Sequence, residues 1–180
     1  GLAASLAIWL LSGGTLALHH PFDNEVLEQQ INEHHCDVLV APAQLALRLG
    51  ESDLASRMPG LRNVIGLWRA PEQVAASEAW TAPHAPLTDV YLFGEAGLFG
   101  ARRGEDGMPV PVMPGPHGAP REQSDSSIAG EILLTPKGTL GLRGPMVPIA
   151  AYAPPPPVGD TLTAQPPRDY VDTAYAARTD

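Results

Sequence analysis

The sequence predicts an α/β fold: a mainly parallel sheet with helices on both faces over about residues 1–100, followed by a small β-rich lobe. Two observations support this prediction. Over the first part of the chain, apolar strand-like runs alternate with helix-like segments, as in parallel sheets built from helical crossovers. Beyond Gly104, short strand-like runs lie between turns rich in proline and glycine, a pattern typical of β-structure.

The domain organisation follows from the same change in composition. The chain has 180 residues, which allows one medium domain or two small lobes. Its 20 prolines and 18 glycines, taken together, are denser after residue 104, mainly because of the prolines, so the two halves should differ in architecture. We expect an α/β subdomain over residues 1–103, a β-rich lobe over 104–153, and a proline-rich connector with an extended tail over 154–180. The four consecutive prolines at 154–157 favour extended polyproline II.

The chain opens on an apolar stretch over residues 2–11, which we interpret as a buried helix that ends at Gly13 and Gly14. The stretch is too short for a membrane span, and no basic residues precede it as they would in a signal peptide. Because a domain seldom starts on a bare buried helix, we expect the chain to be the middle portion of a longer protein.

The next elements are placed by capping residues and apolar spacing. Residues 15–18 are expected to form a short buried strand. Asp23 is a good N-cap for a helix running to about Glu33, with Leu27 and Ile31 one turn apart on its buried side.

Strands and helices then alternate as far as residue 93. Pro42 and Pro71 suit the first turn of a helix, and Ser52 is expected to cap a shorter helix that ends at Pro59. The expected strands cover 36–40, 63–67 and 87–93, and the expected helices cover 43–49 and 71–80. In the β-rich lobe, strands are expected over 110–113, 131–135 and 139–143, with a polar loop over 121–127.

Net charge and cysteine content limit the kinds of partner and the cellular compartment that the sequence favours. The net charge is −9 and Lys137 is the single lysine, so the chain should repel phosphate backbones and nucleic-acid binding is not expected. Cys36 is the single cysteine, which favours a reducing cytoplasm. The excess of arginine over lysine is typical of a GC-rich bacterial source. The sequence does not specify an oligomeric state.

Two histidine pairs raise the alternative of a zinc site. His19-His20 and His34-His35 could in principle combine with Cys36. Adjacent residues on a strand point to opposite faces, so neither pair readily supplies two convergent ligands. We therefore expect no metal at these histidines.

Four short motifs follow one another along the chain, and their order is informative. They are Gly-Gly-Thr-Leu-Ala-Leu followed by Pro-Phe-Asp; Leu61-Arg62-Asn63-Val64-Ile65-Gly66; Tyr91-Leu92-Phe93-Gly94-Glu95-Ala96-Gly97; and Gly130-Glu131-Ile132 followed by Arg143-Gly144-Pro145 and Tyr152. This order and spacing resemble the adenylate-forming superfamily of acyl-CoA synthetases, luciferases and nonribosomal adenylation domains. The resemblance spans essentially the whole chain.

The resemblance implies an AMP-forming acid–thiol ligase. In such enzymes a carboxylic acid attacks the α-phosphate of ATP, pyrophosphate leaves, and the acyl-adenylate is passed to a thiol, here that of coenzyme A. ATP and Mg²⁺ would be the cofactors, and fatty acid metabolism a plausible setting. By motif position Glu95 would be the catalytic residue that binds magnesium. The nucleotide would meet Tyr91, Leu92, Phe93 and Gly94, with Tyr91 against the adenine. The substrate pocket would be lined by Gly66, Leu67, Trp68 and Arg69.

Several positions depart from the family pattern. Gly94 stands where the motif has threonine, and Leu92 replaces its first glycine. Near the end, Thr173-Ala174-Tyr175 resembles the family's Thr-Gly-Asp, so Tyr175 would replace the aspartate; a shifted register would use Asp180 instead. These departures favour an alternative, a degenerate relative that has lost adenylation and acts as a binding or regulatory domain.

Two family elements have no counterpart in the chain. The lysine-bearing phosphate loop would precede residue 1, and the catalytic lysine of the mobile C-terminal domain would follow residue 180. We therefore expect the chain to be incomplete for catalysis. A third, unrelated interpretation is a free-standing α/β interaction domain with a proline-rich tail.

Overall fold

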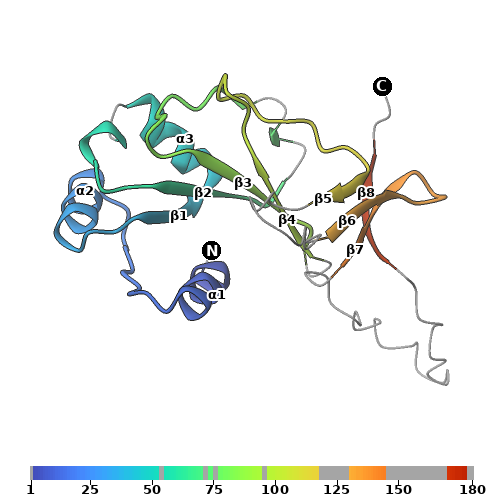
Figure 1. Cartoon of the computed structure of the whole chain (residues 1–180), viewed down its shortest axis with the longest axis horizontal. Coiled ribbons are helices and arrows are strands. Elements are labelled where there is room, and N and C mark those ends of the chain that lie inside the picture. The colour runs from blue at the N-terminus through green and yellow to red at the C-terminus, as the bar shows by residue number, and fades with distance from the viewer. Residues whose placement is uncertain are drawn as a thin grey trace, which may run out of the picture. The chain divides into compact units, whose positions relative to one another are not determined.

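The computed structural model of the chain describes residues 2–52, 55–70, 73–74, 77–94, 97–117, 130–144 and 170–177. The chain forms two compact units (Figure 1). The first comprises Gly1–Tyr91 and Phe99–Pro111, and the second comprises Leu92–Leu98 and Val112–Asp180. The expected boundaries after residues 103 and 153 stay predictions. The expected loop at 121–127 and the prolines at 154–157 lie outside the described residues.

The first unit is built on a four-stranded sheet with the order β1-β2-β3-β4. The strands are β1 (Val38–Pro42), β2 (Asn63–Trp68), β3 (Leu87–Leu92) and β4 (Leu98–Arg102). β1 and β3 both pair with β2 in parallel, so the predicted α/β fold with a mainly parallel sheet is confirmed. Only five residues separate β3 from β4, a connection that permits only antiparallel pairing.

Three α-helices accompany this sheet: α1 (Leu2–Ser12), α2 (Asn24–Glu33) and α3 (Ala43–Glu51). A short 3-10 helix covers Ala55–Arg57. α3 connects β1 to β2 and packs against both strands. Of the described helices, α3 makes the most extensive contact with the sheet. The expectation that helices cover both faces of the sheet is therefore not confirmed.

Helix α2 forms where its capping residue predicts. The Asp23 carboxylate accepts hydrogen bonds from the backbone N–H groups of Glu25 and Val26, at 2.9 and 3.0 Å. These bonds satisfy two of the N–H groups that a helix start leaves without intrahelical partners. Leu27 and Ile31 are buried, as their spacing predicts.

The second unit is an antiparallel sheet with the order β5-β6-β7-β8. Its strands are β5 (Gly115–His117), β6 (Gly130–Leu134), β7 (Thr139–Arg143) and β8 (Val171–Ala176). The predicted β-rich part and its two central strands are therefore confirmed. The turn between β6 and β7 places Gly138 at φ 75°, a left-handed conformation that glycine adopts readily. β8 lies in the segment for which only an extended tail was expected.

The prediction that residues 2–11 form a buried helix is half wrong. The helix is present, but Leu10 is 70% exposed and Leu11 is 89% exposed. The apolar composition correctly indicated a helix. It could not indicate that no described element packs over this part of α1.

Residues 15–18, expected to form a strand, have no strand structure, and Leu18 is 62% exposed. A strand needs a neighbour for its backbone hydrogen bonds, and this segment has none among the described residues. Residues 110–113 are likewise not a strand. Pro109, Pro111 and Pro114 lack the N–H donors that a ladder requires.

The helix expected over residues 71–80 does not reach its predicted end. Ser77 to Trp80 are not helical, because their polar groups bond to the segment after β4. The Trp80 backbone N–H donates to the Gly107 carbonyl, at 2.9 Å, and Arg103 binds the Glu78 carbonyl. Ser52, expected as an N-cap, instead forms the C-cap of α3.

Candidate functional site

One residue of the candidate pocket and one of the nucleotide motif lie opposite each other at one edge of the parallel sheet. In the strand register Trp68 lies opposite Tyr91, and each is at or next to the carboxyl end of its strand. Ligands of open α/β sheets bind outside the carboxyl ends of the strands. The structure thus brings together, at a suitable edge, residues that are 23 positions apart in sequence.

Gly66 and Leu67 are buried inside β2. A Cβ atom added to Gly66 would lie 3.1 Å from the Ala43 Cβ, 3.2 Å from the Ala43 Cα and 3.2 Å from a methyl of Leu87. The missing side chain therefore lets the start of α3 approach β2 closely. Packing alone accounts for this glycine, independently of any ligand.

Trp68 and Arg69 have opposite environments although they are neighbours. The Trp68 side chain is 3% exposed, and its indole Nε1–H donates to Asp89 Oδ1 at 2.8 Å. Arg69, immediately after β2, is exposed and makes no hydrogen bond or ion pair with the described residues. Trp68 thus anchors the strand end, and Arg69 presents a cation just beyond it.

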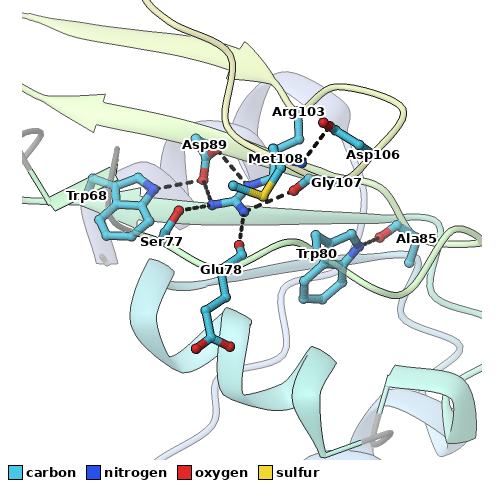
Figure 2. Close-up of polar contacts among 10 residues, drawn as sticks. All are labelled: Trp68, Ser77, Glu78, Trp80, Ala85, Asp89, Arg103, Asp106, Gly107 and Met108. Atoms are coloured by element: carbon cyan, nitrogen blue, oxygen red, sulfur yellow. Dashed lines mark hydrogen bonds and ion pairs between the residues drawn. The ribbon is translucent and has the colours of Figure 1, made fainter.

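A buried ion pair lies behind this edge, and sequence reasoning missed it (Figure 2). Arg103 Nε donates to Asp89 Oδ2 at 2.9 Å, and the two side chains are 3% and 0% exposed. A buried carboxylate is stable only when it is paired and hydrogen-bonded. The sequence signal was the alternation of β3, which places Asp89 on the same buried face as Leu87 and Tyr91.

All five N–H donors of Arg103 are used. Besides Nε, Nη2 donates to Asp89 Oδ1 at 3.3 Å and to Ser77 Oγ at 2.8 Å. Nη1 donates to the carbonyls of Glu78 and Gly107 (Figure 2). The guanidinium therefore joins β3, residues 77–78 and the turn at 104–107 in one unit. It has no donor left for a ligand.

Tyr91 is buried, with 4% of its side chain exposed, and its ring stacks on Phe99 at 5.9 Å and 24°. Burial raises the pKa of Tyr91 to about 12; the Asp89 carboxylate adds to the rise and Arg103 opposes it. The phenol is therefore neutral at physiological pH. In this arrangement Tyr91 supports the strand end through a packed aromatic ring.

The chain enters the second unit after Tyr91. Leu92 is half-buried, whereas Phe93 is 4% exposed and packs edge-on against Tyr175, with ring centroids 5.4 Å apart at 78°. In the sequence, Phe93 and Tyr175 belong to two separate motifs. The structure places them in direct contact within the second unit.

Gly94 occupies a tight turn closed by the Phe93 N–H and the Gly97 carbonyl, at 3.0 Å. Its φ is +57°, in the left-handed region that favours glycine. The turn conformation is thus a physical reason for glycine where the family motif has threonine. Glu95, the proposed magnesium ligand, lies outside the described residues.

Ala174 is one of two non-glycine residues with positive φ in the described chain, at +62°. The backbone N–H of Ala174 donates a hydrogen bond to Asp172 Oδ1 at 2.9 Å, and this bond holds the conformation. The register in which Tyr175 stands at the aspartate position stays a prediction. Asp180, the alternative, lies outside the described residues.

No group of three or more His, Cys, Asp or Glu side chains in the described ranges could hold a metal ion. Burial, with a smaller effect of Asp37, raises the pKa of the Cys36 thiol, so this side chain is a poor thiolate ligand. None of the helices described for the chain has the length and apolarity needed to cross a membrane.

A shallow hollow of about 410 Å³ lies near the start of β3, away from the carboxyl edge. It is lined by Leu87, by Trp80 and by the turn at 104–107. The Trp80 indole N–H is already bound to the carbonyls of Ala82 and Ala85, both at 2.9 Å. The indole N–H is therefore not available to a ligand, and the charged side chains along this hollow include Arg102 and Glu105.

Comparison with known proteins found structural similarity only. The sequence matches no protein family and no curated protein. The N-terminal subdomain of NpsA from Klebsiella oxytoca, solved with anthranilyl-AMSN, is 17% identical with a TM-score of 0.45, covering 73% of this chain and 34% of that one. CmiS6 is 14% identical with a TM-score of 0.41, covering 69% of this chain and 32% of that one. The chain spans about a third of the length of these structures, and neither similarity is close enough to assign a family.

Proposed function

We propose that the chain is part of an AMP-forming ligase that activates a small carboxylic acid with ATP. The observation that carries the proposal is the order of four motifs along the chain, together with the pairing of Trp68 and Tyr91 at one strand edge. The carboxylate oxygen would attack the α-phosphorus, the bond to the β-phosphate oxygen would break, and pyrophosphate would leave. The thiol sulfur of coenzyme A would then attack the acyl carbonyl carbon, the acyl–phosphate bond would break, AMP would leave, and the thiol proton would pass to solvent.

The nucleotide site would use Tyr91, Leu92, Phe93 and Gly94. The stacking of Tyr91 on Phe99 makes this tyrosine a rigid support at the end of β3. The left-handed turn at Gly94 leaves backbone groups without a covering side chain, which suits close approach of a nucleotide. These features support the assignment of the segment to the nucleotide.

The acid would be bound beside Gly66, Leu67, Trp68 and Arg69. Trp68 is a buried anchor, so Arg69 is the residue of this group with a free polar end. A guanidinium forms strong bidentate hydrogen bonds with carboxylates and phosphates. We assign Arg69 the role of contacting an anionic group at the carboxyl edge of β2.

Magnesium would be held by Glu95 and would neutralise charge on the phosphates. The nearest buried carboxylate in the motif region is Asp89, and both of its oxygens are bound, by Trp68 and Arg103. The described residues therefore offer no second carboxylate ligand beside this motif. Magnesium binding stays a proposal for Glu95 alone.

The transfer to coenzyme A, a role in fatty acid metabolism and a cytoplasmic bacterial setting are extensions of the same proposal. They rest on the family resemblance. No described residue distinguishes coenzyme A from another thiol acceptor.

A second candidate function is a degenerate relative that binds without adenylating. The observation in its favour is Gly94: a left-handed turn residue stands in place of the threonine that would face the phosphates. Tyr175, in contact with Phe93, likewise stands in place of the aspartate.

Calorimetric titration of the full-length protein with ATP and Mg²⁺ tests the proposal. Saturable binding is expected, and Glu95→Gln should weaken it only when Mg²⁺ is present. Glu105→Gln, which changes an exposed carboxylate on the 104–107 turn, serves as the matched control and should leave binding unchanged. Absence of any nucleotide binding would reject the proposal.

Pyrophosphate exchange separates the two functions. In the full-length protein, exchange supported by one of a panel of short and long carboxylic acids is expected for a ligase. Nucleotide binding without exchange over the whole panel would establish the degenerate relative instead.

A further inference from the structure

The end of β2 is held by one hydrogen bond from a buried indole. Trp68 is the last residue of the strand, and its Nε1–H donates to Asp89 Oδ1 at 2.8 Å. Arg69 follows at once and is exposed. The Trp68 ring is therefore fixed at the point where the backbone leaves the sheet, next to the exposed Arg69, in addition to the pairing of β2 with β3.

Asp89 is in turn held by Arg103. The carboxylate is fully buried, and it accepts from Arg103 Nε at 2.9 Å and from Nη2 at 3.3 Å. Because the remaining donors of Arg103 bind Ser77, Glu78 and Gly107, the guanidinium cannot shift without breaking several bonds at once (Figure 2). Asp89 thus has a fixed position relative to three chain segments.

The same pair lies under the end of β3. Asp89 and Tyr91 are two residues apart on the buried face of the strand, and Tyr91 is the register partner of Trp68. The two strand ends of the candidate site therefore share one buried support. Neither Asp89 nor Arg103 belongs to any of the sequence motifs.

We propose that Arg103, acting through Asp89, is a positioning residue that fixes Trp68 and thereby sets the ligand-binding geometry at the carboxyl edge of β2 and β3. The identity of the ligand, an adenine nucleotide, rests on the proposed function. The positioning itself rests on the hydrogen bonds of the network.

A double-mutant cycle tests the route from Arg103 to the edge, with affinity for ATP and Mg²⁺ measured on the whole chain. W68F removes the indole donor and keeps an aromatic ring. R103K keeps a cation but cannot reproduce the five-donor fork. Each single variant should weaken ATP binding by roughly tenfold, as expected for a coupled network. In the W68F background R103K should cause no further loss, because its route through the indole is already gone.

A purely structural role predicts a different pattern. In that case R103K would lower the free energy of unfolding and leave ATP affinity unchanged. Alternatively, the losses of ATP affinity in W68F and R103K would multiply in the double variant. Either outcome overturns the proposal. R57K is the matched control, since the exposed Arg57 forms an ion pair with the half-buried Glu28 at 3.0 Å in the same unit. It should leave ATP binding unchanged.

A second measurement keeps the test independent of nucleotide binding. In ¹H–¹⁵N spectra the indole N–H of Trp68 should be protected from solvent exchange in the wild type and should exchange at least tenfold faster in R103K. If R103K does not fold, D89N replaces it, because the amide keeps an oxygen for the indole but lacks the charge that holds Arg103. An unchanged indole signal in the folded variant contradicts positioning. Absence of ATP binding by the wild type, with the indole response as expected, rejects the proposed function and leaves the positioning intact.

Discussion

At the residue scale, the candidate site is shaped by side chains that serve the fold. Trp68, Asp89 and Arg103 form a buried polar network in which each of the hydrogen-bonding groups that faces the core has a partner. Tyr91 is packed beside them. Their chemistry fixes the strand ends, and beside them the exposed Arg69 makes no hydrogen bond or ion pair with the described residues.

The neutral state of Tyr91 has a consequence for stability at high pH. Its folded-state pKa is raised to about 12, so its contribution to stability is present below the ordinary tyrosine pKa and is lost as the pH rises from about 10 to 12. Over this pH window we expect the free energy of unfolding to fall in the wild type. The fall should exceed that of the Tyr91→Phe variant by on the order of 2 kcal/mol. Urea denaturation at pH 9 and pH 11.5 measures the difference. Equal pH dependence in the two proteins would contradict the assignment.

The left-handed conformation of Ala174 gives a second prediction. An alanine at φ 62° is strained by about 1 kcal/mol, a cost that glycine does not bear. Ala174→Gly should therefore leave stability unchanged or raise it by up to about 1 kcal/mol. Ala176→Gly, at the end of the same strand without positive φ, should destabilise. Thermal unfolding of both variants checks the sign, and destabilisation of equal size in both would show that Ala174 is unstrained.

At the element scale, α3 and β2 form the close contact that builds the parallel sheet. Pro42 ends β1 and Ala43 begins α3, so the chain turns from strand to helix without a loop. The helix start then lies on β2 at Gly66. A parallel β1–β2 pair needs a crossover such as α3. The contact of α3 with β2 therefore fixes how the carboxyl ends of β1 and β2 line up at one edge of the sheet.

Gly66→Ala should show how tight this contact is. The added methyl would lie 3.1–3.2 Å from atoms of Ala43 and Leu87, so α3 would have to shift, and we expect a loss of about 1–3 kcal/mol in unfolding free energy. Gly100→Ala on β4 is the control, because its nearest neighbour atom would be 3.8 Å away. Urea denaturation of the two variants measures the contrast. Equal losses would mean that the α3–β2 contact is looser than the structure shows.

At the scale of the whole molecule, α1 stands apart from the core. Its residues have almost no polar side chains, yet its second half is exposed, with Trp9 at 38%, Leu10 at 70% and Leu11 at 89%. Exposed apolar clusters promote association without adding stability to the fold.

Replacing Leu10 and Leu11 with Gln should therefore leave the free energy of unfolding within about 0.5 kcal/mol of the wild-type value, as for other exposed positions. It should also reduce concentration-dependent association, measured by analytical ultracentrifugation. Leu27→Gln is the contrasting variant, because Leu27 is 5% exposed and its replacement should cost several times more. A large loss of stability in the Leu10 and Leu11 variant would show that α1 is packed in solution.

The sequence by itself determined the elements whose signals are local. Asp23 caps α2 through its own neighbours, the alternating residues of β3 give one buried face, and the apolar run of β2 forms a central strand. These outcomes depend on hydrogen bonds and side-chain spacing within a few residues. The motif order that suggests an acid-activating ligase is likewise a local property of the chain.

Only the tertiary structure decided which residues meet. Ser77 to Trp80 do not form the predicted helix because their polar groups bond to Arg103 and Gly107, which lie 25 to 27 residues away in sequence. The exposed Leu18, expected within a strand, found no neighbour to complete a ladder among the described residues. In the sequence Asp89 is one residue of an alternating strand. Only the structure shows that the buried Arg103 is its partner. The physical reason is that backbone and buried polar groups need hydrogen-bond partners, and whether the packed chain brings such a partner within reach depends on residues remote in sequence.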